Sequence, residues 1–299
     1  MQTRESAITA TIQYFDTFDF APTLLEVEKW LLKNESPSPT LAEIQHILDT
    51  NPAIKNKQGY YFLAGQEALV QTRKQKYDYT DQKWKHAKPF LNILALMPHV
   101  KAIWFSNSMG WGNAKKSSDI DLIIVTTPKR IWSARFFTTA LMKILRQRPH
   151  EQQEEKALCL SFFMTDDHFN LQQYKIGPDD VHFTFWATQF YPVYDPENLF
   201  DTYKRNNAWI NESFTNLHWT TTIQGRNITL GPIGRTIKKI LELFSPESLL
   251  RKIQMRIMPD KIKNMANKDN RVVINDHILK LHTNDRRIEQ QTLWEAKTH

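Results

Sequence analysis

The chain has 299 residues, enough for two or three domains around a sizeable hydrophobic core. Its 39 Lys and Arg against 32 Asp and Glu give a formal net charge of +7, which suits partners that carry phosphate. Because there is one cysteine, Cys159, and no long apolar run, we expect a cytoplasmic protein without a disulfide framework, a signal peptide or a membrane span.

Residues 1–65 are predicted to form a first domain of three helices followed by a β-hairpin. The apolar positions predict helices over residues 6–18, 22–31 and 41–48. Thr40 and Glu43 form a capping box at the start of the third helix, in which each side chain accepts a hydrogen bond from the other's backbone N–H. The hairpin strands are expected at residues 54–55 and 60–63.

This order of elements resembles the winged helix-turn-helix fold, and the resemblance implies DNA binding through the third helix and the hairpin. A helix that reads DNA needs cations for the phosphates and usually Arg or Asn for the base edges. The polar positions of the third helix carry no arginine, only Glu43, Gln45, His46 and Asp49. DNA binding is therefore possible, but a structural or protein-contact role is favoured.

Residues 66–98 are predicted to connect this domain to the next one. One long helix, or two joined helices, is expected over residues 66–97, and Pro98 ends it. Basic side chains alternate with aromatic ones along this segment. The basic residues are Arg73, Lys74, Lys76, Lys83, Lys85 and Lys88. They indicate either a basic face along a substrate groove or a solvated charged face, and the second interpretation is favoured.

The strongest local pattern of the chain is a strand, a polar loop and a second strand. The two strands are predicted at residues 101–105 and 120–125. Asp119 and Asp121 open the second strand and share one face of it, with Cα atoms about 6.5–7 Å apart, because side chains alternate along a strand. Carboxylates at this spacing can share Mg²⁺ or Mn²⁺, ions that prefer oxygen ligands.

In this loop Asn107 and Ser108 are followed by ten residues and then by Asp119 and Asp121. The chain therefore resembles the nucleotidyltransferase superfamily, whose signature is G-S-x10-D-x-D and whose fold is that of DNA polymerase beta and the minimal nucleotidyltransferases. Asn107 stands where the signature has glycine, and asparagine is among the few residues that tolerate left-handed backbone. The resemblance implies an α+β core, a small mixed β-sheet flanked by helices, within residues 99–200.

The resemblance also implies roles for individual residues. Asp119 and Asp121 would be catalytic and would hold Mg²⁺ or Mn²⁺, and Asn107, Ser108 and Gly112 would bind the nucleoside triphosphate. A nucleoside monophosphate would then move to a hydroxyl acceptor, which could be a protein, an RNA or a small molecule. The sequence indicates neither the acceptor nor the base of the nucleotide.

The next predicted strand, residues 157–164, lacks a group that the resemblance leads one to expect. In the family this strand often carries a third catalytic carboxylate that helps to activate the attacking hydroxyl. Here Ser161 is the only polar residue in its middle, on the face predicted for Cys159 and Phe163. The two aspartates that follow the strand come too late to replace the carboxylate.

The remaining elements are mostly helical. Helices are predicted over residues 128–146, 179–190, 197–214, 233–244 and 245–258, with a turn over residues 191–196. A short hairpin is expected at residues 272–274 and 277–281. Residues 201–299 should thus form a mainly helical C-terminal region. The basic helix over residues 245–258 is expected to pack on the catalytic domain rather than on an anionic membrane.

Together these patterns predict a Mg²⁺-dependent nucleotidyltransferase with slow turnover, because general-base assistance is not evident. The alternative is a non-catalytic regulator that senses a nucleotide and binds DNA through the winged helix. Asn107 and the absent third carboxylate favour the regulator. The paired carboxylates favour the enzyme, because they repel each other unless a cation offsets their charge.

Overall fold

The computed structural model describes residues 3–34, 37–148, 155–177, 180–219 and 226–298. At its centre lies a six-stranded sheet with the strand order β6-β3-β4-β5-β8-β7. The strands are β3 (Val100–Phe105), β4 (Ile120–Thr126), β5 (Leu158–Thr165), β6 (Tyr191–Tyr194), β7 (Val272–Ile274) and β8 (Ile278–Leu281). β4 and β5 are parallel and the other neighbours antiparallel, so the predicted α+β class with a mixed sheet is confirmed.

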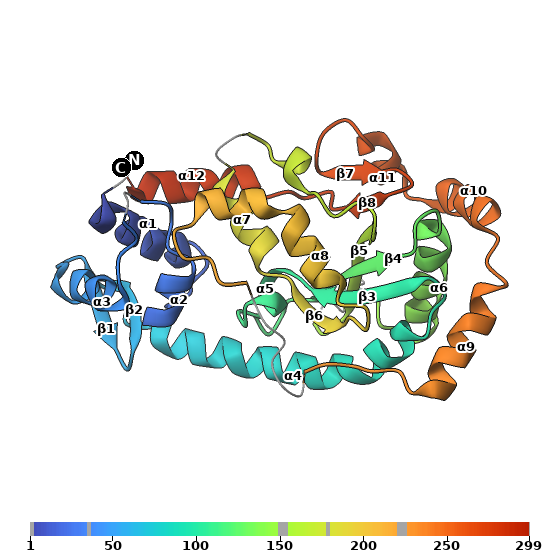
Figure 1. Cartoon of the computed structure of the whole chain (residues 1–299), viewed down its shortest axis with the longest axis horizontal. Coiled ribbons are helices and arrows are strands. Elements are labelled where there is room, and N and C mark those ends of the chain that lie inside the picture. The colour runs from blue at the N-terminus through green and yellow to red at the C-terminus, as the bar shows by residue number, and fades with distance from the viewer. Residues whose placement is uncertain (1–2, 35–36, 149–154, 178–179, 220–225, 299) are drawn as a thin grey trace.

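Helices cover both faces of this sheet (Figure 1). One face carries α4 (Leu69–Ala95) and α6 (Ile131–Ile144), and the other carries α7 (Val181–Thr188) and α8 (Leu199–Asn206). Along β4, Leu122 and Ile124 lie in the first core, whereas Ile123 and Val125 lie in the second. By the same alternation Asp121 lies on the face that α7 and α8 cover.

An irregularity in β5 corrects the predicted faces of this strand. Leu160 and Phe163 are three residues apart, yet both lie in the core beneath α4 and α6. The pairing of β5 with β4 shifts register between Cys159 and Phe162, as at a β-bulge, where one extra residue reverses the alternation. The prediction that Phe163 shares the face of Cys159 and Ser161 is therefore wrong.

The N-terminal residues form the predicted series of three helices and a hairpin. These elements are α1 (Arg4–Asp16), α2 (Leu24–Lys29), α3 (Leu41–Thr50), β1 (Ile54–Lys57) and β2 (Tyr60–Leu63). The capping box of Thr40 and Glu43 is present at the start of α3. The three helices and the hairpin enclose a small core that includes Ile8, Val27 and Ile44.

The long helix α4 does not present a uniformly solvated charged face. Arg73, Lys76 and Lys83 are buried, and each donates hydrogen bonds to backbone carbonyl oxygens of other segments. Arg73 Nη1 reaches Gly112 O at 3.1 Å, and Lys83 Nζ reaches Ser118 O at 2.5 Å. The favoured interpretation is thus wrong for these three cations, which fasten the α1–α2 connection and the loop between β3 and β4 to α4.

Two predictions between residues 191 and 214 are also wrong. The turn expected at residues 191–196 contains β6, an edge strand paired with β3. The helix expected over residues 197–214 is divided into α8 and a 3₁₀ helix, Ala208–Ser213, at Asn207. The buried Asn207 side chain accepts from Leu171 N–H and donates to Phe169 O, which holds the break in place. The first residue of the helix predicted over residues 179–190 lies outside the described residues.

The C-terminal region is mainly helical, as predicted, but it also completes the sheet. Its helices are α9 (Pro232–Glu242), α10 (Glu247–Ile257), α11 (Asp260–Met265) and α12 (Arg287–Thr298). The predicted hairpin is β7 and β8, which extend the sheet beyond β5. α12 returns to α1, where Trp294 Nε1 donates to Ala10 O. Within the described ranges, no helix has both the length and the apolar character to cross a membrane.

Candidate active site

The predicted strand–loop–strand unit brings its polar residues together. β3 and β4 lie side by side, and the loop between them begins with the short helix α5 (Asn107–Gly110). Ser106 N–H donates to Asp121 O at 3.1 Å, so the loop starts next to the second aspartate. Asn107 has a φ of 48°, in the left-handed region that asparagine tolerates better than most residues.

The Asn107 side chain connects β4 to α7. Its Nδ2 donates to Asp121 Oδ2 at 2.7 Å, and its Oδ1 accepts from Trp186 Nε1 at 2.8 Å. Glycine, which the family signature has at this position, could make neither bond. Asn107 therefore positions the Asp121 carboxylate, a role that the sequence analysis did not assign to it.

Asp119, Asp121 and Cys159 each direct a polar atom into one small space. These atoms lie within 4.8 Å of one another, and the parallel pairing of β4 with β5 sets Asp121 opposite Cys159. Burial and, after it, the negative charge of Asp119 raise the pKa of Asp121 to about 7. The two carboxylates thus lie close enough to repel each other unless a proton or a cation offsets their charge.

The donor atoms of this group fit Mg²⁺ or Mn²⁺ better than zinc. Burial, followed by the charges of Asp121 and Asp119, raises the pKa of the Cys159 thiol well above its ordinary value. The sulfur is therefore protonated at neutral pH in the metal-free protein, which leaves the two carboxylates as the charged ligands of this group. Carboxylate oxygens suit Mg²⁺, which commonly takes one or two of them and fills its other positions with water and phosphate oxygens. Asp119 and Asp121 would hold such an ion.

Two cations of the interior act on Asp119. Burial lowers the pKa of Lys83, and the nearby charges of Glu155 and Asp119 partly offset this effect. Burial likewise lowers the pKa of Arg148, and the charges of Cys159 and Asp119 act in the opposite direction and raise it. Arg148 Nη1 is buried and has no hydrogen-bond partner among the described residues. Neither cation was assigned to the site from sequence, because both come from other elements, α4 and the segment after α6.

The position opposite the carboxylates on β5 is occupied by a serine–histidine pair. Ser161 Oγ lies 2.9 Å from His282 Nε2 and 3.3 Å from Cys159 Sγ. Burial lowers the pKa of His282 to about 4, with the charge of Lys280 acting in the same direction, so the imidazole is neutral. His282 follows β8, and the pairing of β8 with β5 brings it to Ser161. No motif in the sequence indicated this contact.

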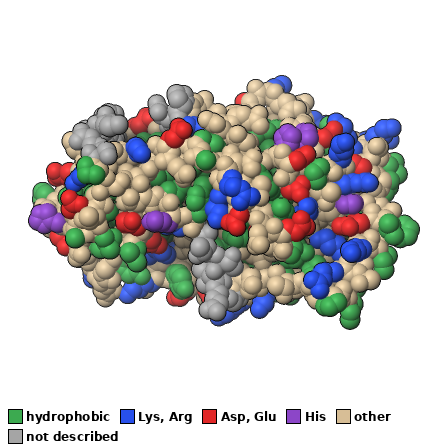
Figure 2. All heavy atoms as spheres, in the orientation of Figure 1, with side chains coloured by type: hydrophobic (Ala, Val, Ile, Leu, Met, Phe, Trp, Pro, Cys, Tyr) green, Lys and Arg blue, Asp and Glu red, His purple; other side chains and the backbone are tan. Residues whose placement is uncertain are grey.

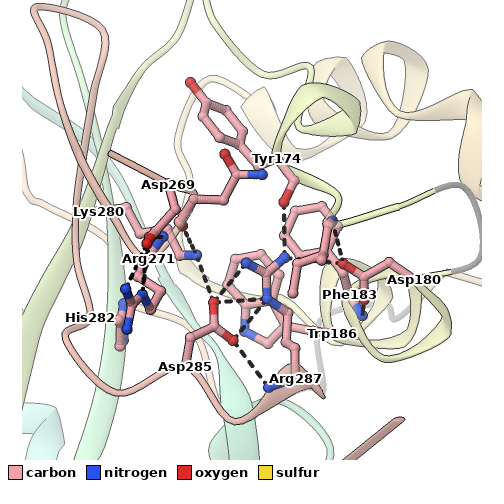
Figure 3. Close-up of polar contacts among 12 residues, drawn as sticks. Tyr174, Asp180, Phe183, Trp186, Asp269, Arg271, Lys280, His282, Asp285 and Arg287 are labelled. Carbon is pink, nitrogen blue, oxygen red and sulfur yellow. Dashed lines mark hydrogen bonds and ion pairs between the residues drawn. The ribbon is translucent and has the colours of Figure 1, made fainter. Parts of the chain in front are cut away.

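A buried ion cluster holds the segment that carries His282 (Figure 3). Arg287 Nη2 lies 2.6 Å from Asp285 Oδ2, and Arg287 Nη1 lies 3.1 Å from Asp180 Oδ2. Burial raises the pKa of Asp285, but the hydrogen bonds of Arg287 and the charge of Lys280 outweigh it and lower the pKa to about 2. Asp285 is therefore ionised at neutral pH, and the contacts of Arg287 with Asp285 and Asp180 tie the C-terminal segment to the start of α7.

A cleft of about 550 Å³ opens beside this site. Its volume is in the range of small-molecule pockets. Aromatic side chains line it together with polar and basic ones, among them Phe18, Trp111, Trp186, Asn107, Ser108, Lys115, Lys280, His282 and Arg286. Ser108 thus lies in the wall of the cleft. Gly112, which was also expected to bind nucleotide, is not among the lining residues, and its carbonyl accepts from Arg73.

A second group of potential metal ligands lies beyond the other end of β5. It consists of Asp167, His168 and His277, and the two imidazole rings stack with centroids 3.6 Å apart. Next to it, Asp166 Oδ2 accepts from Lys101 Nζ at 2.6 Å. The length of β5 separates both aspartates from the first group, so neither supplies a third carboxylate there.

Comparisons with protein-family models, with curated proteins and with solved structures find no match for this chain.

Proposed function

We propose that this protein is a nucleotidyltransferase that moves a nucleoside monophosphate from a nucleoside triphosphate to a hydroxyl acceptor. The observation that carries the proposal is the pair of carboxylates on Asp119 and Asp121, held within 4.8 Å beside a loop whose Asn107 and Ser108 line a cleft. We further propose that residues 99–200 form the nucleotidyltransferase core and that the N-terminal helices and hairpin form a winged helix.

The side chains of the cleft suit the parts of a nucleotide. Aromatic faces such as that of Trp186 can stack on a base, and basic groups such as Lys115 and Arg286 can pair with phosphates. A divalent ion on Asp119 and Asp121 would neutralise negative charge that develops on the phosphates. The hydroxyl of Ser108 would donate a hydrogen bond to a phosphate oxygen.

His282 supplies the base that the β5 strand lacks. The oxygen of the acceptor hydroxyl forms a bond to the α-phosphorus, the bond from that phosphorus to the β-phosphate oxygen breaks, and pyrophosphate leaves. The acceptor proton passes to neutral His282, directly or through the Ser161 hydroxyl, which lies 2.9 Å from Nε2. General-base assistance is typically worth about 10²–10⁴-fold in rate, and the low pKa of His282, about 4, makes it a weak base and places its contribution at the lower end of that range.

The alternative, a nucleotide-sensing regulator that binds DNA through the winged helix, has less support. The α3 surface offers acidic and neutral polar side chains, including the exposed Glu43 and Asp49, which repel phosphates. DNA binding therefore remains a secondary expectation.

The test uses purified protein with each α-labelled nucleoside triphosphate and Mg²⁺ or Mn²⁺, supplied with protein, RNA or small-molecule fractions of a lysate. Label should move to an acceptor in one fraction with release of pyrophosphate. Asp119→Asn and Asp121→Asn should abolish transfer, and Asp276→Asn, a change at a half-exposed carboxylate far along the chain, should leave it unchanged. His282→Ala should slow transfer roughly 10²-fold without weakening nucleotide binding.

Two outcomes would contradict the proposal. Nucleotide binding without label transfer to any fraction would favour the sensor. Transfer that persists in both aspartate variants would place the chemistry elsewhere in the chain.

A further inference from the structure

More than half of the large hydrophobic side chains that the described residues leave exposed lie between residues 233 and 257. This segment covers α9 and α10, at one end of the molecule. In Figure 2, hydrophobic and basic side chains are visible together at that end. Scattered exposed hydrophobic residues are ordinary, but a contiguous group of them indicates a contact surface.

On α9 the exposed hydrophobic residues form one line. Ile233, Ile237 and Ile240 are separated by four and three positions, which places them on a single side of the helix, and the exposed Phe244 follows in the turn directly after α9. Ile233 is 78% and Phe244 72% exposed. The other side of the helix is held by the body of the protein, where Lys238 Nζ donates to the carbonyl of the last residue of α4. Packing therefore turns the apolar line outward.

α10 repeats this arrangement. Leu249, Ile253 and Ile257 are spaced four residues apart and are all exposed. The helix is fixed from its opposite side, because Gln254 Nε2 donates to Trp132 O at 2.7 Å. Hydrogen bonds to neighbouring segments thus set the orientation of both helices and leave both apolar lines uncovered by the described residues.

The charges around these lines are mostly positive. Residues 232–263 contain eight Lys and Arg and three Asp and Glu. Two of the acids turn toward the protein, since Glu242 accepts from a backbone N–H at residue 99 and Glu247 accepts from two at the start of α6. The exposed flanks of the apolar lines carry Arg235, Lys239, Lys252 and Arg256. This surface therefore complements a negatively charged partner that is apolar beneath its charges.

We propose that α9 and α10 dock on the surface of an anionic lipid bilayer. In such binding the apolar side of an amphipathic helix enters the boundary between headgroups and acyl chains, and flanking Lys and Arg contact anionic headgroups. A second copy of the chain is a poorer partner, because a two-fold contact would place the same cations against each other. The proposal does not depend on the proposed catalytic activity.

The test is flotation of the full chain with vesicles of phosphatidylglycerol and phosphatidylcholine in equal parts, compared with phosphatidylcholine alone. Binding should require the anionic lipid and should fall as salt is raised. Phe244→Glu and Ile240→Glu should each weaken it roughly tenfold or more, because each removes an inserted apolar group and adds a repelled charge. Leu25→Glu, a matched change at a 66% exposed hydrophobic residue of α2, should have no effect.

All three substituted side chains are exposed, so the variants should unfold at the temperature of the wild type. Equal binding to both vesicles, binding to neither, or unchanged binding by Phe244→Glu would overturn the proposal. So would sedimentation velocity that shows a dimer in the wild type and a monomer in Phe244→Glu, since the surface would then join two copies of this chain.

Discussion

Replacing Asp121 by asparagine should stabilise the metal-free protein at high pH. The pKa of this carboxyl is about 7 in the folded protein against an ordinary value of 3.8. Between these values the folded state holds a proton that the unfolded chain has released. The stability contributed by this group is therefore present below about pH 4 and is lost as the pH rises through 7.

The size of the effect follows from the pKa difference. One pKa unit corresponds to about 1.4 kcal/mol, and the group is only half ionised at pH 7, so an isolated group with this pKa would lose about 2.5 kcal/mol between about pH 5 and pH 8. Partial exposure of the side chain and its coupling to Asp119 reduce the loss, and we expect about 2 kcal/mol. The amide that replaces the Asp121 carboxyl in the variant cannot ionise, but its oxygen can still accept the hydrogen bond from Asn107.

The assay is urea unfolding of the wild type and Asp121→Asn across this pH range without divalent ions. The variant should gain about 2 kcal/mol on the wild type between about pH 5 and pH 8. The quantity to compare is the difference in the free energy of unfolding between the two proteins, because other groups contribute to the pH dependence of both. His282, for example, has a pKa of about 4 in the folded protein against an ordinary value of 6.5. Asp276→Asn should follow the wild type at every pH.

Mg²⁺ provides the second half of the test. At about pH 8 it should stabilise the wild type, since a ligand that binds the folded state raises its stability, and should have no effect on Asp121→Asn. If wild type and variant show the same pH dependence, the carboxylates do not repel each other in the folded state. Asp119 and Asp121 would then not form a cation site.

Three further substitutions test the surroundings of the site by chemical unfolding. Asn107→Val should lower the free energy of unfolding by about 2–4 kcal/mol and weaken nucleotide binding. A β-branched residue resists a φ of 48° and cannot make the two amide hydrogen bonds of Asn107. An unchanged nucleotide affinity would show that this residue is not part of the site. Lys83→Ala should lower the free energy of unfolding by about 2 kcal/mol or more, because the loop carbonyl groups lose their hydrogen-bond donor. The control Lys85→Ala, at a 73% exposed side chain, should lower it by less than about 0.5 kcal/mol. Equal losses in the two variants would contradict the structural role of the buried Lys83. Gly110→Ala should lower the free energy of unfolding by about 3 kcal/mol or more, because the added Cβ would lie 1.9 Å from the carbonyl oxygen of Gln189. In the control Gly231→Ala the added Cβ would meet nothing within 4 Å. Similar stabilities of the two variants would refute the close packing of α5 on the end of α7.

The sequence by itself determined the features that depend on near neighbours in the chain. Short runs of apolar residues, rich in β-branched and aromatic side chains, placed β3 and β4 to within one residue at each end. The alternation of side chains along a strand put Asp119 and Asp121 on one face. The capping box of Thr40 and Glu43 marked the start of α3 correctly. These predictions succeeded because hydrogen bonding and side-chain direction over three or four residues follow from local backbone geometry.

Other features of the site were decided by tertiary structure. Ser161 and His282 are separated by 121 positions, and Asn107 and Trp186 by 79. They meet only because β8 pairs with β5 and α7 packs over the sheet. A pattern of apolar residues specifies which face of an element is buried, but it does not specify which polar group of a distant segment will lie there.

The buried cations and the β6 strand show the same limit. Lys83 occupies a polar-looking position on a long helix, and its burial depends on carbonyl groups of a loop more than 30 residues away. β6 follows a helix and contains a proline, and its strand conformation comes from pairing with β3 at the edge of the sheet. In both cases the hydrogen-bond partners that offset the cost of burying polar groups become available only once the chain has folded.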